Sequence, residues 1–199
     1  MTMSESAKNL DDQNNPVNVI NEILRSKALE TLKIRSKVDD IELGDVENKD
    51  DFLYGPMMAF LLIHGESFRV TFKVHYFLKT AKSLAAALLG RPSEEITVEL
   101  TKDFMKEFCN IVGGEVRAAI TRLNVRVGVT LPFIISGFDE VLFSDEISPS
   151  SSMDYWLLNW KSGFVVCSSV IDIRDPELLR GVEARNDNEN DTAGEIVFL

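Results

Sequence analysis

The chain has 199 residues, of which 45% are hydrophobic and 27% are charged, a composition that suits one globular domain with additional tails. Its formal net charge of −11 at pH 7 argues against nucleic-acid binding, which needs lysine and arginine to neutralise phosphates, and against attachment to an anionic membrane. The sequence starts without a basic and apolar leader and has no apolar run of about 18 residues, so we expect a soluble cytoplasmic protein.

The first part of the chain predicts a polar tail, a helix and an acidic loop. Residues 1–14 are polar and are predicted to be a disordered tail. Asn15 and Pro16 are residue types preferred at a helix N-cap and at the first helical position, and apolar residues at helical spacing continue to about Arg35. Segment 39–51 contains seven acidic residues and one lysine, which predicts an exposed loop.

A β-hairpin and a short helix are predicted next. The apolar run Met58–Ile63, the turn residues 64–67 and the strict alternation from Phe68 to Tyr76 are typical of two antiparallel strands. An Ala/Leu-rich helix is predicted for residues 79–89, because the Gly-Arg-Pro sequence at 90–92 ends it.

The second half repeats the order of a long helix followed by strands. We predict a helix from an N-cap at Thr101 to about Leu123, and a strand at Val125–Val129 that ends before Pro132. A further short strand at 141–143 and a last hairpin over residues 153–173 follow, and residues 174–199 form an acidic tail.

These elements predict one domain over residues 15–173, between the tails 1–14 and 174–199. Its class is α+β, an antiparallel β-sheet with two long helices packed on it. The two halves are too different in sequence to establish an internal repeat.

The second long helix carries a narrow polar stripe. At 100° per residue, six of its side chains fall within about 80° of each other, while the apolar residues occupy the opposite side. The members of the stripe are Asp103, Glu107, Asn110, Gly114, Arg117 and Thr121. Such a stripe is either an ordinary solvated face or a binding face.

Two residue choices favour a binding face. Asn110 is a poor residue for a helix interior because its amide competes with the backbone, and each glycine of Gly113-Gly114 costs about 1 kcal/mol relative to alanine. Gly114 lies on the stripe beside Asn110, where it would let the backbone of a partner approach closely.

The pattern D-x-x-x-E-x-x-N at Asp103, Glu107 and Asn110, with Gly-Gly after it and Pro132 further on, resembles the CheC/CheX/FliY phosphatases of bacterial chemotaxis. The spacer between Asn110 and Pro132 is 21 residues, one residue shorter than in the family pattern. The matching positions on the first helix hold Asn18, Glu22 and Arg25, and arginine cannot replace the asparagine. One site is therefore expected, as in CheX-like members, instead of two.

The resemblance implies a CheC/CheX-like fold and a phosphatase for the aspartyl phosphate of a CheY-like receiver domain, with Mg²⁺ supplied by the receiver and no cofactor of its own. By the same resemblance, Asn110 positions the attacking water and Glu107 pairs with a lysine of the receiver. Asp103, Gly114 and Arg117 are expected at the contact with the partner. Two alternatives remain open: an adaptor that binds the receiver without catalysis, and a purely structural adaptor whose stripe is solvated.

The remaining predictions concern metal and assembly. Cys109, Cys167, His64 and His75 show no metal-ligand spacing, so no metal site is expected and the cysteines are interpreted as small buried apolar residues. The CheX branch forms dimers by joining sheets, and the proline-free final hairpin, rich in aromatic residues, is expected to offer an edge for a homodimer.

Overall fold

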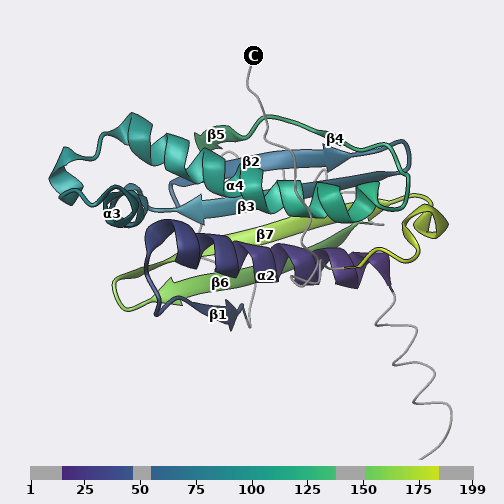
Figure 1. Ribbon diagram of the computed structural model, residues 1–199, viewed down its shortest axis with the longest axis horizontal. Helices are drawn as coiled ribbons and strands as arrows, with labels where there is room; N and C mark the ends of the chain where they lie inside the picture. Colours follow the sequence, from purple (N-terminus) through teal and green to yellow (C-terminus); the bar gives the residue numbers. More distant parts are fainter. Residues whose placement is uncertain (1–14, 47–54, 138–150, 184–199) are drawn as a thin grey trace, which may run out of the picture.

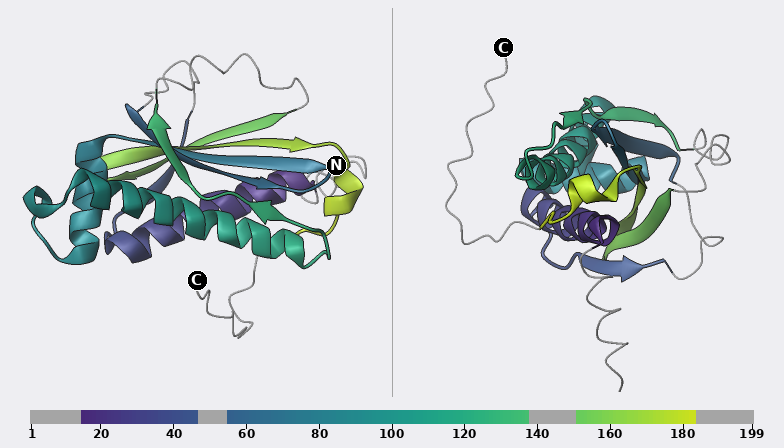
Figure 2. Two further views of the ribbon diagram at one scale, coloured as in Figure 1. Left: turned by 90° about the horizontal axis from the view of Figure 1, so that it is seen from above. Right: turned by 90° about the vertical axis from the view of Figure 1, so that its right-hand side faces the viewer.

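A computed structural model describes residues 15–46, 55–137 and 151–183. Within these ranges, one seven-stranded antiparallel sheet is covered on one face by two long helices (Figures 1 and 2). The helices are α2 (Pro16–Ser36) and α4 (Val98–Thr121), and the shorter α3 (Leu78–Leu89) lies at one end of the sheet. The predicted α+β class, with long helices packed on an antiparallel sheet, is confirmed.

The order of the strands reveals the internal duplication that the sequence left open. The order is β1–β6–β7–β3–β2–β4, with β5 also paired to β2, so the edge strands of each half lie against a long strand of the other half. The bounds are β1 Glu42–Asp45, β2 Met57–His64, β3 Phe68–Tyr76, β4 Gly128–Val129, β5 Phe133–Ser136, β6 Ser152–Trp160 and β7 Gly163–Ile173. Each half has a long helix and two long strands, with the short strand β1 in the first half and the short strands β4 and β5 in the second, and the halves meet at β3 and β7.

The two long helices share one pattern of burial. Pro16, Ile20, Ile23 and Leu24 of α2 each lie 85 positions before a buried residue of α4. In this register Arg25 is the position of α2 that is equivalent to Asn110 of α4, in agreement with the sequence comparison of the two helices. The core between helices and sheet is apolar, and both cysteines are buried in it as free thiols, which confirms the interpretation of them as small buried apolar residues.

Local sequence explains the ends of the helices. The Asn15 side chain accepts a hydrogen bond from the Val17 N–H, and Pro16 occupies the first helical position, as predicted. Helix α3 ends at Gly90, which has φ +62°, a conformation that glycine adopts without strain.

The predicted N-cap of α4 is wrong by one turn. Thr97 is the cap, and its side chain accepts a hydrogen bond from the Leu100 N–H. Thr101 lies inside the helix, fully buried, and its hydroxyl donates to the Thr97 carbonyl.

Two other expectations need correction. Residues 42–45 of the acidic segment form strand β1, because they pair with residues 156–159 of β6, in a register from Glu42–Asn159 to Asp45–Trp156. The final hairpin offers less of a sheet edge than expected, since β7 lies between β6 and β3 and β1 pairs with residues 156–159 of β6; within the described ranges, residues 152–155 of β6 have no partner strand on that side. The expected strand at 141–143 lies outside the described residues.

The described part of the chain continues past residue 173. A 3₁₀-helix, η4 (Pro176–Leu179), follows β7, and Leu179 and Val182 are buried in the core. The segment 174–183 therefore packs on the domain, while residues 1–14 and 184–199 lie outside the described ranges. A second 3₁₀-helix, η2 (Ser93–Glu95), links α3 to α4.

Candidate functional site

The polar stripe of α4 lies on the outer side of the helix. Asp103, Glu107, Gly114 and Arg117 are exposed and Asn110 is half-buried. Apolar residues of the opposite side, Met105, Phe108, Val112 and Val116, are buried against the sheet. Helix α4 lies in front of the sheet in Figure 1, and the motif residues belong to the side of the helix that is not buried against the sheet.

The two adjacent glycines have different roles. A Cβ atom at Gly113 would lie 2.7 Å from Cδ2 of Leu61, whose side chain is fully buried, so this glycine lets α4 pack closely on β2. A Cβ atom at Gly114 would meet no heavy atom within 4 Å. The structure gives Gly113 a packing reason, whereas packing does not explain Gly114, which leaves a low surface one turn after Asn110.

The motif side chains differ in their partners. The Arg35 Nη2 atom donates to Glu107 Oε1 at 3.2 Å, and Lys106 Nζ lies 2.6 Å from Asp103 Oδ1. The Asn110 side chain forms no hydrogen bond with any residue in the described ranges. Its amide, which can both donate and accept, therefore keeps its hydrogen-bonding capacity for an incoming molecule, one turn from a carboxylate held by an arginine.

Arg35 is a residue of the site that sequence reasoning missed. It lies in the last turn of α2, 72 positions before Glu107, and only the packing of α2 on α4 brings the two together. Both side chains are about half exposed, 42% and 51%, so solvent screens the pair strongly. No local sequence pattern signals this contact.

The remaining predicted residues extend the same surface. Thr121 Oγ1 donates to the Arg117 carbonyl, which fixes the far end of the stripe. Pro132 is half-buried in the link between β4 and β5.

The matching site on α2 is occupied by a structural contact. Arg25 Nε and Nη2 donate to the two carboxylate oxygens of Asp154, each at 2.7 Å, and Nη1 donates to Asp45 at 2.7 Å. The guanidinium also lies 5.4 Å from the ring centroid of Trp156. The hydrogen bonds to Asp154 raise the pKa of Arg25 against the opposing effect of burial. This side chain connects α2 to the sheet. At this position α2 therefore has no side-chain amide comparable to that of Asn110.

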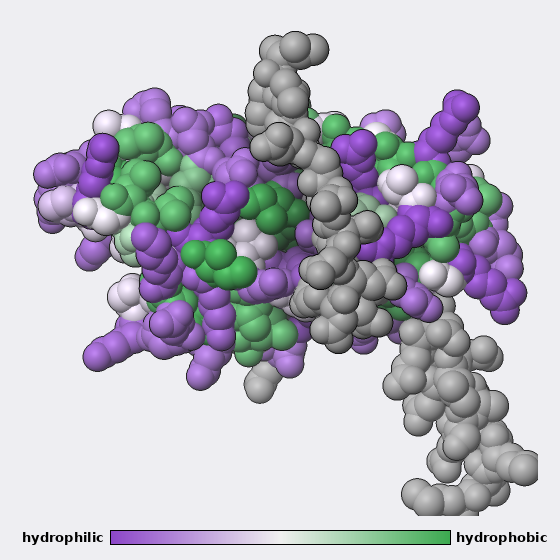
Figure 3. Space-filling view, viewed as in Figure 1, coloured by the Kyte–Doolittle hydropathy of each residue, from purple (hydrophilic) through white to green (hydrophobic). Residues whose placement is uncertain are grey.

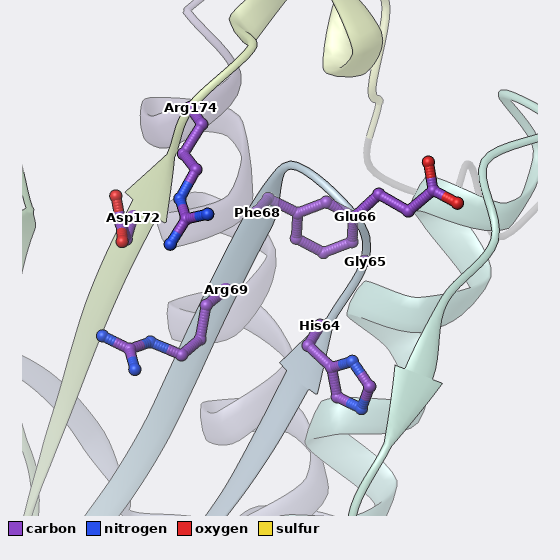
Figure 4. A pocket seen from close by; sticks show the side chains of 7 residues that line it. All are labelled: His64, Gly65, Glu66, Phe68, Arg69, Asp172 and Arg174. Atoms are coloured by element: carbon purple, nitrogen blue, oxygen red, sulfur yellow. The ribbon is translucent and has the colours of Figure 1, made fainter.

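A pocket lies at the β2–β3 turn, distant in sequence from α4. It has a volume of about 240 Å³ and is lined by His64, Gly65, Glu66, Phe68, Arg69, Asp172 and Arg174. Figure 4 shows that His64, Glu66 and Arg69 point in different directions instead of toward one another. These side chains do not form a convergent catalytic group.

Searches for a metal site and for a membrane span cover the same described ranges. Within them, no group of three or more His, Cys, Asp or Glu side chains is placed to hold a metal ion. No helix there is both long and apolar enough to cross a membrane.

Comparisons with known proteins identify the fold. No family model and no curated protein matches the sequence. Among solved structures, a CheC-like superfamily protein from Shewanella sp. PV-4 superposes with a TM-score of 0.59 at 14% identity, over 79% of this chain and 97% of that chain. CheX from Desulfovibrio desulfuricans gives a TM-score of 0.57 at 17% identity, over 77% and 99%.

A third similar structure is a complex of CheX with CheY, BeF3 and Mg²⁺ from Borrelia burgdorferi. It superposes with a TM-score of 0.59 at 19% identity, over 77% of this chain and 97% of that chain. Nearly the whole of each of these structures is matched, and the α4 motif had indicated the same fold. The chain therefore has the fold that CheC-like and CheX proteins share.

Proposed function

We propose that this protein is a phosphatase that stimulates hydrolysis of the aspartyl phosphate on a CheY-like receiver domain, in chemotaxis or another two-component pathway. The observation that carries the proposal is the pair Glu107 and Asn110, one turn apart on the outer face of α4, in a chain with the CheX-like fold. A CheX of this fold has been crystallised with CheY, BeF3 and Mg²⁺, which supports a receiver as the partner.

The chemistry needs little from this chain beyond positioning. A water oxygen bonds to phosphorus as the bond from phosphorus to the aspartyl oxygen breaks, which yields aspartate and inorganic phosphate. The receiver supplies the Mg²⁺ and the lysine that neutralise phosphoryl charge. A neutral amide at Asn110 can hold the attacking water in line without adding negative charge beside the phosphoryl group.

Glu107 and its neighbours would fix the orientation of the receiver. The carboxylate of Glu107 is exposed and would pair with the receiver's active-site lysine. Asp103, Gly114 and Arg117 lie on the same stripe and would contact the receiver around this pair.

A second candidate function is a non-catalytic adaptor that binds a receiver. Glu107 is already paired with Arg35, and the spacer from Asn110 to Pro132 is 21 residues, one fewer than the family pattern. Both features would alter the docking of a receiver, and either could leave binding without turnover.

The proposal includes a location and an assembly. Receiver domains act in the cytoplasm, so we place this protein there. A homodimer through the edge formed by β4 and β5 is part of the proposal, because this edge has no further partner strand within the described ranges and the exposed side chains Leu131 and Phe133 lie along it.

The decisive experiment measures dephosphorylation of phosphorylated CheY-like receivers from the same organism in the presence of Mg²⁺. Asn110→Ala is expected to lose about 100-fold in stimulated rate, since positioning commonly supplies several kcal/mol. Thr121→Ala, on the same stripe three turns away, is the matched control and is expected to keep its activity. Full activity of Asn110→Ala would refute the mechanism, and wild-type binding without turnover would establish the adaptor instead.

A further inference from the structure

An apolar pocket opens on the helical face between α3 and α4, directly beside Glu107. Its volume is about 220 Å³, larger than the cavities of about 150 Å³ that hold a benzene ring. Its walls are Ala85, Leu88 and Leu89 of α3 and Leu100, Phe104 and Phe108 of α4, and its rim carries Arg35, Asp103 and Glu107. Figure 3 shows hydrophobic side chains gathered over this end of the helical face.

The fold itself creates this hollow. Helix α3 ends at Gly90 in a left-handed conformation, and the chain turns away through η2 before α4 begins. Leu89 and Leu100 form the lips of the pocket and stay 44% and 38% exposed. Polar residues would serve solubility better at both positions, so the two leucines call for a reason other than folding.

The charge of the chain favours a basic partner. On the rim, Glu107 is paired with Arg35 and Asp103 with Lys106, but the whole chain carries a net charge of −11. A second copy of this chain would be repelled by this charge, whereas a protein that presents a lysine would be attracted and could take the place of Arg35 beside Glu107. Because Glu107 lies on the rim, a partner that pairs with it also covers the mouth of the pocket.

We propose that this pocket anchors the receiver domain by taking up one of its exposed apolar side chains, of leucine to phenylalanine size, while the receiver's lysine replaces Arg35 as the partner of Glu107. The inference rests on the proposed function and names the contact that supplies its binding energy. Apolar anchors in pockets commonly dominate the energy of an interface, and the ion pair beside them sets the register. Leu89 and Leu100 would then determine affinity, and Asn110 the rate.

The test uses the full chain and a CheY-like receiver from the same organism, loaded with beryllium fluoride and Mg²⁺. The double variant Leu89→Ala/Leu100→Ala removes the lips of the pocket and keeps residues that favour helices. The matched control is Leu178→Ala, a leucine with 44% exposure on η4, outside the pocket. Calorimetry measures receiver affinity, and circular dichroism checks that both variants remain folded.

The double variant is expected to bind the receiver loaded with beryllium fluoride about tenfold more weakly. In a separate assay with the phosphorylated receiver, it is expected to keep the wild-type rate of dephosphorylation at saturating receiver. Unchanged affinity in this variant, or an equal loss in Leu178→Ala, would refute the pocket and leave the proposed function standing. Failure of the wild-type chain to bind any receiver would refute the proposed function and the pocket together. An affinity that rises when residues 184–199 are removed would show that the chain's own C-terminal segment, and not the partner, occupies the pocket.

Discussion

Replacement of Arg25 by methionine tests whether α2 has exchanged a catalytic role for a structural one. The variant keeps the aliphatic stem and removes the guanidinium. It eliminates the two hydrogen bonds to Asp154, the one to Asp45 and a weaker one of 3.2 Å to the Tyr155 carbonyl, together with the contact over Trp156.

The expected loss follows from the exposure of these groups. Removing one partner of a fully buried ion pair costs about 3–5 kcal/mol, but the Arg25 and Asp154 side chains are 23% and 21% exposed, so solvent reduces this to about 2–3 kcal/mol. The contact with Trp156 adds about 0.5–1 kcal/mol. Asp45 is 80% exposed and contributes little. The free energy of unfolding is therefore expected to fall by about 3 kcal/mol.

Urea unfolding followed by circular dichroism measures this loss, with Asp45→Asn as the matched control at under about 0.5 kcal/mol. A loss below about 1 kcal/mol for Arg25→Met, or one equal to that of the control, would show that Arg25 does not tie α2 to the sheet. In that case another contact would have to explain why α2 holds an arginine at the position that matches Asn110.

Two other predictions concern Glu107 and the cysteines. Glu107→Lys is expected to weaken receiver binding, measured by calorimetry, by tenfold or more, because it places a cation against the receiver's lysine. Glu107→Gln is expected to have a smaller effect. If both variants bound the receiver as tightly as the wild type, the ion pair would be contradicted. Burial raises the pKa of the Cys109 and Cys167 thiols, so both stay neutral at pH 8 and are expected to react with a thiol reagent only after unfolding; fast reaction of the folded chain would contradict their buried placement.

Local chemistry made part of the fold predictable. Asn15 and Pro16 predict the start of α2 because both work locally. The Asn15 side chain accepts a hydrogen bond from a nearby backbone N–H, and the Pro16 ring fixes a helical φ. The alternation from Phe68 to Tyr76 likewise reflects a strand with one face on the core. The buried and exposed sides of α4 follow from helical periodicity, so the polar stripe was predictable from its spacing.

Features that depend on distant contacts were not predictable. Thr97 and Thr101 are equally good caps by residue type, and the burial of Thr101 decides between them. Strand β1 has no apolar alternation, and its extended form depends on pairing with β6, more than a hundred positions later. The pairing of Arg35 with Glu107 likewise exists only once α2 lies on α4.

The motif occurs on only one of the two long helices, and the contacts of Arg25 give a structural reason for this. Both long helices bury the same faces, so both could expose a motif, yet the position on α2 that matches Asn110 holds Arg25. That guanidinium reaches strands β1 and β6, which belong to different halves of the fold. Stability at this contact and catalysis on the same helix would need different side chains at one position.

The last prediction concerns assembly at the sheet edge of β4 and β5. Strand β5 pairs with β2 on one side, and no strand within the described ranges pairs with its other side. Leu131 is 79% and Phe133 52% exposed there, and Phe133 stacks on Phe60 with ring centroids 5.7 Å apart. Such an edge favours pairing with a second copy, although the net charge of −11 opposes it.

Light scattering at micromolar concentration is expected to give the mass of a dimer, and added salt should favour it by screening the repulsion. Phe133→Lys is expected to give a monomer, since it places an unpaired ammonium group in the edge. Leu178→Lys, at similar exposure on η4, should remain dimeric. A monomeric wild type at all salt concentrations would refute the dimer. A dimer that persists in Phe133→Lys would show that the interface does not lie at β4 and β5. The short edge strand β1 would then be tested next, because its outer side also lacks a partner strand in the described part of the chain.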